Sequence, residues 1–159
     1  MIPQGTRLRL PALEAPPFRG KPTIVELSGS WCTNCTHAQP VLLELYRRLH
    51  PAGLELVTVL YEFTDDAEQN RRQADEYRRV YGIVWPVVVI DGTVDHADEI
   101  LPMEVEGLDL SGFPLIFFLG ADGEVRGFHA GFPAPQAKEE FAEAVRGLQG
   151  AAAELTAPR

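Results

Sequence analysis

The 159-residue chain has only two cysteines, Cys32 and Cys35, and they lie three positions apart. An apolar run over residues 23–28 precedes them, and a helical pattern follows them. A Cys-x-x-Cys pair between a strand and a helix is typical of a site that alternates between dithiol and disulfide. Two cysteines are too few for the disulfide framework of a small secreted domain. The pair is therefore predicted to be functional rather than a structural cross-link.

Thiol–disulfide exchange requires one of the two sulfurs to react as a thiolate. Cys32 is expected at the N-terminus of the following helix, where free N–H groups and the helix dipole favour negative charge. We expect Cys32 to attack a substrate disulfide. Cys35, one turn further along, would then attack the mixed disulfide and release the reduced substrate. No cofactor is expected beyond a redox-active Cys32–Cys35 disulfide.

Metal and haem binding fit the sequence less well. A zinc site usually has four ligands, and the chain has no second cysteine pair. Haem attachment needs a histidine directly after the second cysteine, but that residue is Thr36. The acidic stretch 95–99, which contains His96, could bind a metal, but it lacks a fixed ligand spacing. No metal is therefore expected.

A glutamate, Glu26, lies in the most apolar predicted strand, six residues before Cys32. A carboxyl group desolvated at this position should have a raised pKa, which suits a general base near neutral pH. The alternative is a glutamate at a sheet edge that reaches solvent. Because an idle buried charge is costly, we favour a buried Glu26 with a role in proton transfer.

Alternating and periodic apolar residues, together with glycine and proline at the breaks, divide the chain into short elements. The expected strands cover residues 6–10, 23–28, 54–60, 85–90, 114–119 and 124–129. The expected helices cover residues 33–49, 66–81 and 136–148. An acidic insert over residues 91–111 interrupts this rhythm.

This order of elements predicts an α/β fold. Strand–helix–strand crossovers imply parallel neighbouring strands, and a tight turn at Asp122-Gly123 adds an antiparallel edge. Helices on both faces of this mixed sheet would form a three-layer α/β/α domain. We expect a single domain over residues 1–159, with a core at about 6–148 and a frayed tail at 149–159.

Several short motifs have the spacing found in one known family. They are Gly20-Lys21-Pro22, Trp31-Cys32-x-x-Cys35, Pro40, Tyr81-Gly82-Ile83 and Gly112-Phe113-Pro114. Together they resemble thioredoxin-fold proteins, and most of all the TlpA/ResA-like branch of thiol–disulfide oxidoreductases. The resemblance covers roughly residues 6–148 and implies a thioredoxin-like fold with an insert before the strand that carries the cis-proline.

The resemblance also implies roles for four residues near the cysteines. Thioredoxins have a buried acid at the place of Glu26, and it takes the proton from the second cysteine. Phe113 and Pro114 would form the cis-proline pair that faces the cysteines, so that a bound peptide can pair with the Phe113 backbone. The alternative is an ordinary trans proline that opens a strand. Trp31 and Phe113 would form an apolar rim for substrate, although Trp31 could equally be a packing residue.

The predicted function is that of a protein disulfide reductase. Strong oxidants of this fold tend to have a histidine between the cysteines, where this chain has Thr33-Asn34. The expected partners are protein disulfide or dithiol clients and an electron-donating thiol protein. A peroxiredoxin-like peroxidase is an alternative, but the residues before Cys32 do not match its Pro-x-x-x-Thr-x-x-Cys motif. A thioredoxin-fold binding module without turnover is the other alternative.

The formal charge of −9 disfavours binding to nucleic acid or to anionic membrane surfaces. No apolar run approaches the roughly 18 residues needed to span a bilayer, so no membrane contact by this domain is expected. Residues 1–4 lack the basic and apolar regions of a signal peptide. A cytoplasmic location follows if Met1 is the native start, and a periplasmic or other extracytoplasmic location follows if a leader was removed.

Overall fold

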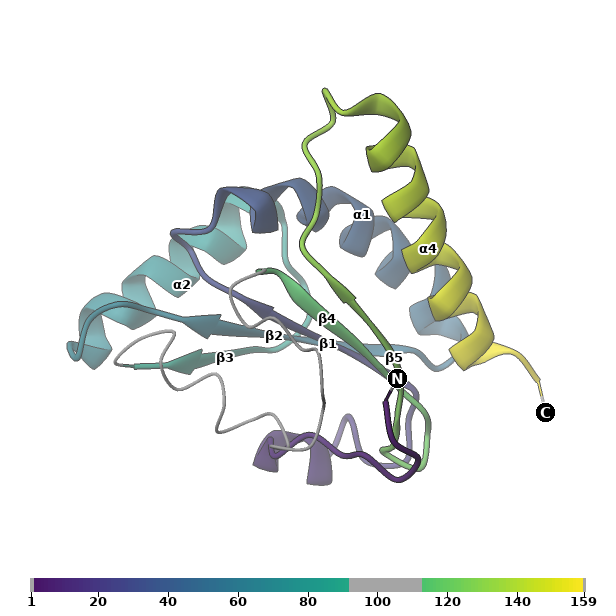
Figure 1. Cartoon of the computed structure of the whole chain (residues 1–159). Coiled ribbons are helices and arrows are strands. Elements are labelled where there is room, and N and C mark those ends of the chain that lie inside the picture. Colours follow the sequence, from purple (N-terminus) through teal and green to yellow (C-terminus); the bar gives the residue numbers. More distant parts are fainter. Residues whose placement is uncertain (1, 92–112, 159) are drawn as a thin grey trace.

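The computed structural model describes residues 2–91 and 113–158. These residues form a mixed five-stranded sheet in the order β3-β2-β1-β4-β5 (Figure 1). Strands β1, β2 and β3 are parallel, whereas β4 is antiparallel to β1 and β5 is antiparallel to β4. The strands are β1 (Thr23–Ser28), β2 (Glu55–Tyr61), β3 (Val87–Ile90), β4 (Leu115–Leu119) and β5 (Val125–Ala130).

Three α-helices cover one face of this sheet (Figure 1). They are α1 (Thr33–Leu49), α2 (Ala67–Tyr81) and α4 (Lys138–Thr156), and the short 3-10 helix η2 (His50–Ala52) follows α1. Among the described residues, the opposite face is covered by the N-terminal segment, which contains the 3-10 helix η1 (Pro11–Glu14). Within these same residues, no helix is long and apolar enough to cross a membrane.

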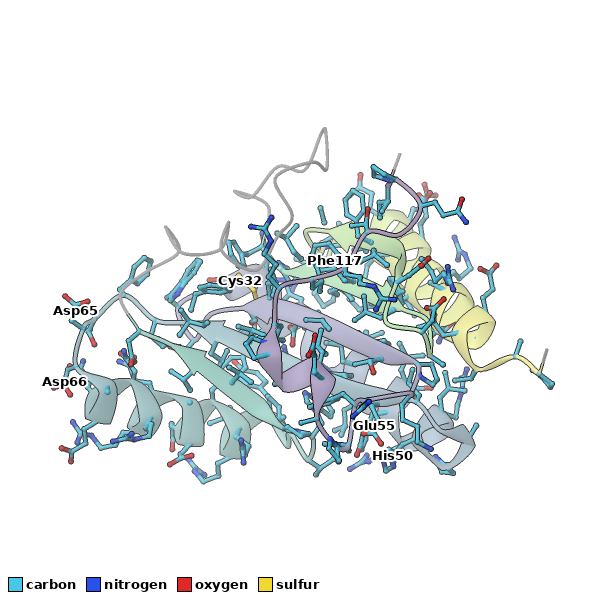
Figure 2. The ribbon with its side chains drawn as sticks, turned by 90° about the horizontal axis from the view of Figure 1, so that it is seen from below. Cys32, His50, Glu55, Asp65, Asp66 and Phe117 are labelled. Carbon is cyan, nitrogen blue, oxygen red and sulfur yellow. A yellow bond between two sulfur atoms is a disulfide. The ribbon has the colours of Figure 1, made fainter. Side chains whose placement is uncertain are left out.

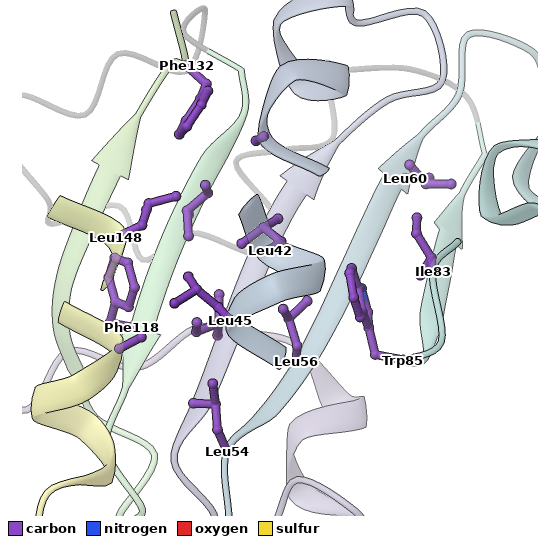
Figure 3. Packing of buried hydrophobic residues seen from close by; sticks show 14 of the residues in the cluster. Leu42, Leu45, Leu54, Leu56, Leu60, Ile83, Trp85, Phe118, Phe132 and Leu148 are labelled. Atoms are coloured by element: carbon purple, nitrogen blue, oxygen red, sulfur yellow. The ribbon is translucent and has the colours of Figure 1, made fainter. Parts of the chain in front are cut away.

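The central strand β1 is buried along its whole length, because both faces of the sheet are covered there. Ile24 belongs to the core between the sheet and the helices, whereas Val25 and Leu27 belong to the core under the N-terminal segment. Figure 3 shows the helix-side core, where leucines from α1, β2 and α4 pack together. Since side chains alternate along a strand, Glu26 points into this helix-side core.

The predicted strand over residues 6–10 is wrong. These residues have no strand assignment, and the backbone bond that joins them to the sheet runs from Val125 N to Thr6 O over 2.8 Å. Leu8 and Leu10 are nevertheless buried in the core on this face. The alternating pattern therefore reflects a segment that lies across an apolar face, and Pro11 then starts η1 instead of extending a strand.

The predicted frayed tail over residues 149–159 is also wrong, because α4 continues to Thr156. Ala152 is fully buried, and Leu155 packs against the same core. We expected the helix to end at residue 148, but Gly147 and Gly150 are both accommodated within it. The alanine-rich stretch that follows them has a high helix propensity and keeps a buried face.

The N-terminus of α2 provides a test of the fold. Asp66 is the N-cap, and its Oδ1 accepts hydrogen bonds from the backbone N–H groups of Glu68 and Gln69, both at 3.1 Å. We expect Asp66→Ala to lower the free energy of unfolding by about 1 kcal/mol, as measured by urea denaturation. Asp65→Ala, one residue earlier, should leave it unchanged. Equal losses in the two variants would contradict this role for Asp66.

Candidate active site

The two cysteines form a disulfide where β1 leads into α1, as the yellow bond in Figure 2 marks. Cys32 is the N-cap of α1, and its Sγ accepts a hydrogen bond from Cys35 N over 3.3 Å. Cys32 retains 6% exposure, whereas Cys35 is fully buried. Cys32 is therefore the sulfur that an incoming group can reach. When the disulfide is reduced, the helix N-terminus favours negative charge on that same sulfur.

The aromatic residues expected at the site do lie together. The Trp31 indole N–H donates to Tyr61 O over 2.6 Å, and its ring meets the Phe113 ring edge-on at 5.7 Å between centroids. Phe113 belongs to the same buried cluster as both cysteines. The Phe113–Pro114 peptide bond is cis, as the sequence predicted. Trp31 is thus both held by the protein and part of an apolar rim, so the two roles considered for it are compatible.

Glu26 is fully buried, and the alternative of a solvent-reaching glutamate is excluded. Its Oε1 accepts a hydrogen bond from Gln39 Nε2 over 2.6 Å, and its Oε2 accepts one from Thr58 Oγ1 over 2.7 Å. Burial raises the pKa of Glu26 from 4.5 to about 7, although the bonds from Thr58 and Gln39 oppose this rise. The carboxyl group is consequently able to gain or lose a proton near neutral pH.

Gln39 connects Glu26 to the buried cysteine. Besides its bond to the carboxylate, Gln39 Nε2 donates to Cys35 O over 3.3 Å. Sequence reasoning missed Gln39, but its spacing of four residues from Cys35 places both on one face of a helix. It also missed Thr58, which pairs with Glu26 in the register of β1 and β2 and accepts a bond from the Trp85 indole over 2.8 Å.

A second buried acid, Glu62, lies on the other side of the Trp31–Cys32 turn. It is 2% exposed, and its Oε1 and Oε2 accept bonds from Ser30 N over 3.1 Å and from Ser30 Oγ over 2.7 Å. The sequence did not indicate this contact. Glu62 follows an apolar strand at its end, where polar residues are commonly exposed, and its partner is 32 residues away.

Metal binding finds no support among the described residues, where no group of three or more His, Cys, Asp or Glu side chains could hold an ion. The stretch 95–99, which we considered as a metal site, lies outside the described residues. Its role therefore stays a hypothesis from the sequence.

No protein-family model matches the sequence. Among curated proteins, the thiol-disulfide oxidoreductase ResA of Geobacillus kaustophilus is 22% identical over 129 residues, which cover 81% of this chain and 66% of that protein. ResA of Bacillus thuringiensis subsp. konkukian is 26% identical over 113 residues, which cover 71% of this chain and 57% of that protein. The chain thus spans less than two thirds of the length of these relatives.

Solved structures agree on the fold. A thiol:disulfide interchange protein of the thioredoxin family from Chlorobium tepidum has a TM-score of 0.63 at 17% identity, covering 87% of this chain and 82% of that one. A secreted disulfide oxidoreductase from Mycobacterium tuberculosis has a TM-score of 0.57 at 19% identity, covering 86% and 84% of the two chains.

These likenesses and the site geometry define the class: the chain has a thioredoxin-like fold of the α/β class, with a Cys-x-x-Cys disulfide at the start of a helix. Within that class, its sequence is similar to thiol–disulfide oxidoreductases of the ResA/TlpA type. The predicted fold class and the predicted resemblance are both confirmed. The peroxidase and binding-module alternatives are not favoured.

The buried Glu26 carboxyl makes protein stability depend on pH. An acid whose pKa rises from 4.5 to about 7 on folding stays protonated up to a higher pH in the folded state than in the unfolded state. Its contribution to the free energy of unfolding is therefore largest below pH 4.5. This contribution falls by about 3 kcal/mol between pH 4.5 and 7. We expect Glu26→Gln to remove this decline, so that the variant gains stability relative to the wild type as pH rises.

Urea unfolding of the oxidised proteins at several pH values measures this difference, because the disulfide keeps both cysteines from titrating. Glu143→Gln, which replaces an exposed acid on α4, is the matched control and should follow the wild type. Parallel curves for wild type and Glu26→Gln would contradict a raised pKa of Glu26.

Proposed function

We propose that this chain is a thiol–disulfide oxidoreductase that reduces disulfide bonds in client proteins. The observation that carries the proposal is the unequal exposure of two bonded sulfurs at a helix N-terminus. Cys32 is reachable and caps α1, whereas Cys35 is sealed inside. This asymmetry is what a mixed-disulfide mechanism requires, with one sulfur to attack and the other to resolve.

In the first step, the Cys32 thiolate attacks one sulfur of the client disulfide. A new S–S bond joins Cys32 to the client, the client's own S–S bond breaks, and the other client sulfur leaves as a thiolate that takes a proton. In the second step, the Cys35 thiol gives its proton to the Glu26 carboxylate, and the Cys35 sulfur attacks Cys32 Sγ. The mixed disulfide breaks, and the client leaves with both of its sulfurs reduced.

The two electrons gained by the client come from the dithiol, which ends as the Cys32–Cys35 disulfide. A dithiol donor must reduce this disulfide again before the next cycle, so the proposal includes an electron-donating thiol partner. Trp31 and Phe113 supply the apolar rim against which the client segment lies. The cis Phe113–Pro114 bond lies directly before β4, where a client strand would pair with the backbone.

The two cysteines should respond differently to substitution. In a dithiothreitol-driven assay of insulin reduction, we expect the wild type to accelerate the reduction of insulin. The Cys32→Ser variant should show only the uncatalysed rate. Cys35→Ser should accumulate clients bound to Cys32, visible as mixed disulfides on non-reducing gels. Trapping on Cys35 in the Cys32→Ser variant would reverse the assignment. A wild type as inactive as Cys32→Ser would favour a binding module without turnover.

Glu26 should matter in the resolving step. Without a proton acceptor near Cys35, we expect Glu26→Gln to slow resolution of a preformed mixed disulfide by about 10²-fold, the lower range for a general base. Acid-quenched single-turnover kinetics would measure this rate, and the first attack by Cys32 should be little affected. Glu143→Gln again serves as the control. An unchanged resolution rate in Glu26→Gln would make its role structural.

A further inference from the structure

Phe63 is an exposed aromatic residue at the edge of the redox site. Its side chain is 56% exposed, which is unusual for a large apolar group, yet its ring lies 4.8 Å from the Trp31 ring between centroids. The other exposed large apolar residues among those described are Val80, Val84 and Phe128. Of these four, Phe63 contacts the tryptophan next to Cys32. An exposed aromatic beside a reactive group is a common feature of protein-binding surfaces.

The backbone that carries Phe63 is held firmly against the cysteine turn. Tyr61 O accepts the Trp31 indole bond, and the Glu62 carboxylate accepts two bonds from Ser30. Glu62 N also donates to Ile90 O over 3.1 Å. A buried carboxylate is costly unless it is hydrogen-bonded, so these bonds make Glu62 an anchor for this turn. Phe63 is thus presented from a fixed position, which lowers the entropy lost on binding.

We infer that residues 61–63 form a client-binding lip, in which Glu62 is a positioning residue and Phe63 contacts an apolar side chain beside the client cysteine. The inference rests on the proposed function, because it names the class of client for the same site. It extends the rim of Trp31 and Phe113 by a residue that the sequence did not indicate. Phe63 would therefore determine which clients are reduced rapidly, and it would not take part in the exchange itself.

The charge beyond Phe63 indicates the kind of client. Asp65 and Asp66 follow Phe63 after one intervening residue, Thr64, and both are exposed. Figure 2 shows them at the outer end of this segment, away from Cys32. Asp66 caps α2, whereas the Asp65 carboxylate has no hydrogen bond or ion pair with any other residue that the structure describes. An extended segment advances about 3.3 Å per residue, so client residues a few positions from the cysteine would pass these carboxylates. The occupant that fits is an extended segment with an apolar residue and then a basic one.

A set of short disulfide-linked peptide dimers tests this inference. The residue next to the cysteine is leucine or glycine, and the residue three positions further is lysine or glutamate. For the leucine–lysine peptide, we expect Phe63→Ala to lower kcat/KM about tenfold, while Phe63→Leu keeps most of it. Turnover of the glycine peptides and of dithiobis(nitrobenzoate), a small disulfide, should be unchanged. Val84→Ala is the matched control, because Val84 is 65% exposed and precedes β3, at the end of the parallel strands opposite the cysteines.

The same assay also tests whether the site selects client peptides by their charge. We expect the wild type to prefer lysine over glutamate peptides by up to about fivefold, and Asp65→Asn to reduce that preference. Added salt should reduce it as well. Glu139→Gln, which removes an exposed charge at the start of α4, should have no effect. Equal rates for lysine and glutamate peptides in the wild type would overturn the assignment of basic clients.

The outcomes separate this inference from the proposed function. If the wild type turns over no disulfide faster than Cys32→Ser, the proposed function fails. If the wild type is active but Phe63→Ala has the same kcat/KM as the wild type for both the leucine and the glycine peptides, residues 61–63 do not form a client-binding lip. An equal loss for all peptides and for the small disulfide would also overturn it, since Phe63 would then only support Trp31.

Discussion

The burial of one carboxyl group, that of Glu26, ties the central elements together. Thr58 reaches it from β2, Gln39 reaches it from α1, and Trp85 holds Thr58 from the segment before β3. A slip of one residue between β1 and β2 would turn Thr58 to the other face of the sheet and leave the carboxyl with one donor fewer. The energetic cost of that loss favours the observed register. Gln39, the other donor to the carboxyl, lies beside Cys35 because the two are four residues apart on α1.

Two buried acids, Glu26 and Glu62, are bonded to residues next to the cysteines in different ways. Glu26 points into the helix-side core, where burial brings its pKa close to neutral. Glu62 lies beside the turn before Cys32 and is used for geometry, since both of its oxygens accept bonds from Ser30. In the proposed cycle, Glu26 exchanges a proton with the resolving sulfur, while Glu62 fixes Ser30 in the turn that carries Trp31 and Cys32. Such support is what a reactive group needs for reproducible alignment.

Local signals predicted much of this fold. Helix α1 has the predicted bounds of residues 33 and 49, because the cysteine pair, the apolar spacing and His50-Pro51 all lie close in the sequence. Glu26 was found because a charge in an apolar strand stands out. Gln39, Thr58 and Glu62 were missed, since their roles depend on partners brought close by sheet register and chain reversal. The pattern over residues 6–10 misled, because alternation arises equally in a strand and in a segment laid across a core.

The hydrogen bond from Trp85 to Thr58 links a fluorescent side chain to the Glu26 carboxyl. The chain has two tryptophans, and each lies at one of the two functional centres. Trp31 directly precedes Cys32 of the disulfide, whereas the Trp85 indole is joined through the Thr58 hydroxyl to the Glu26 carboxyl. A proton gained or lost by Glu26 changes the electric field along that short chain of bonds. The intrinsic fluorescence of Trp85 is therefore coupled to the charge of Glu26, and that of Trp31 is coupled to the state of the sulfurs. A variant that lacks one of the two indoles reports the fluorescence of the other alone, so the two signals can be followed separately.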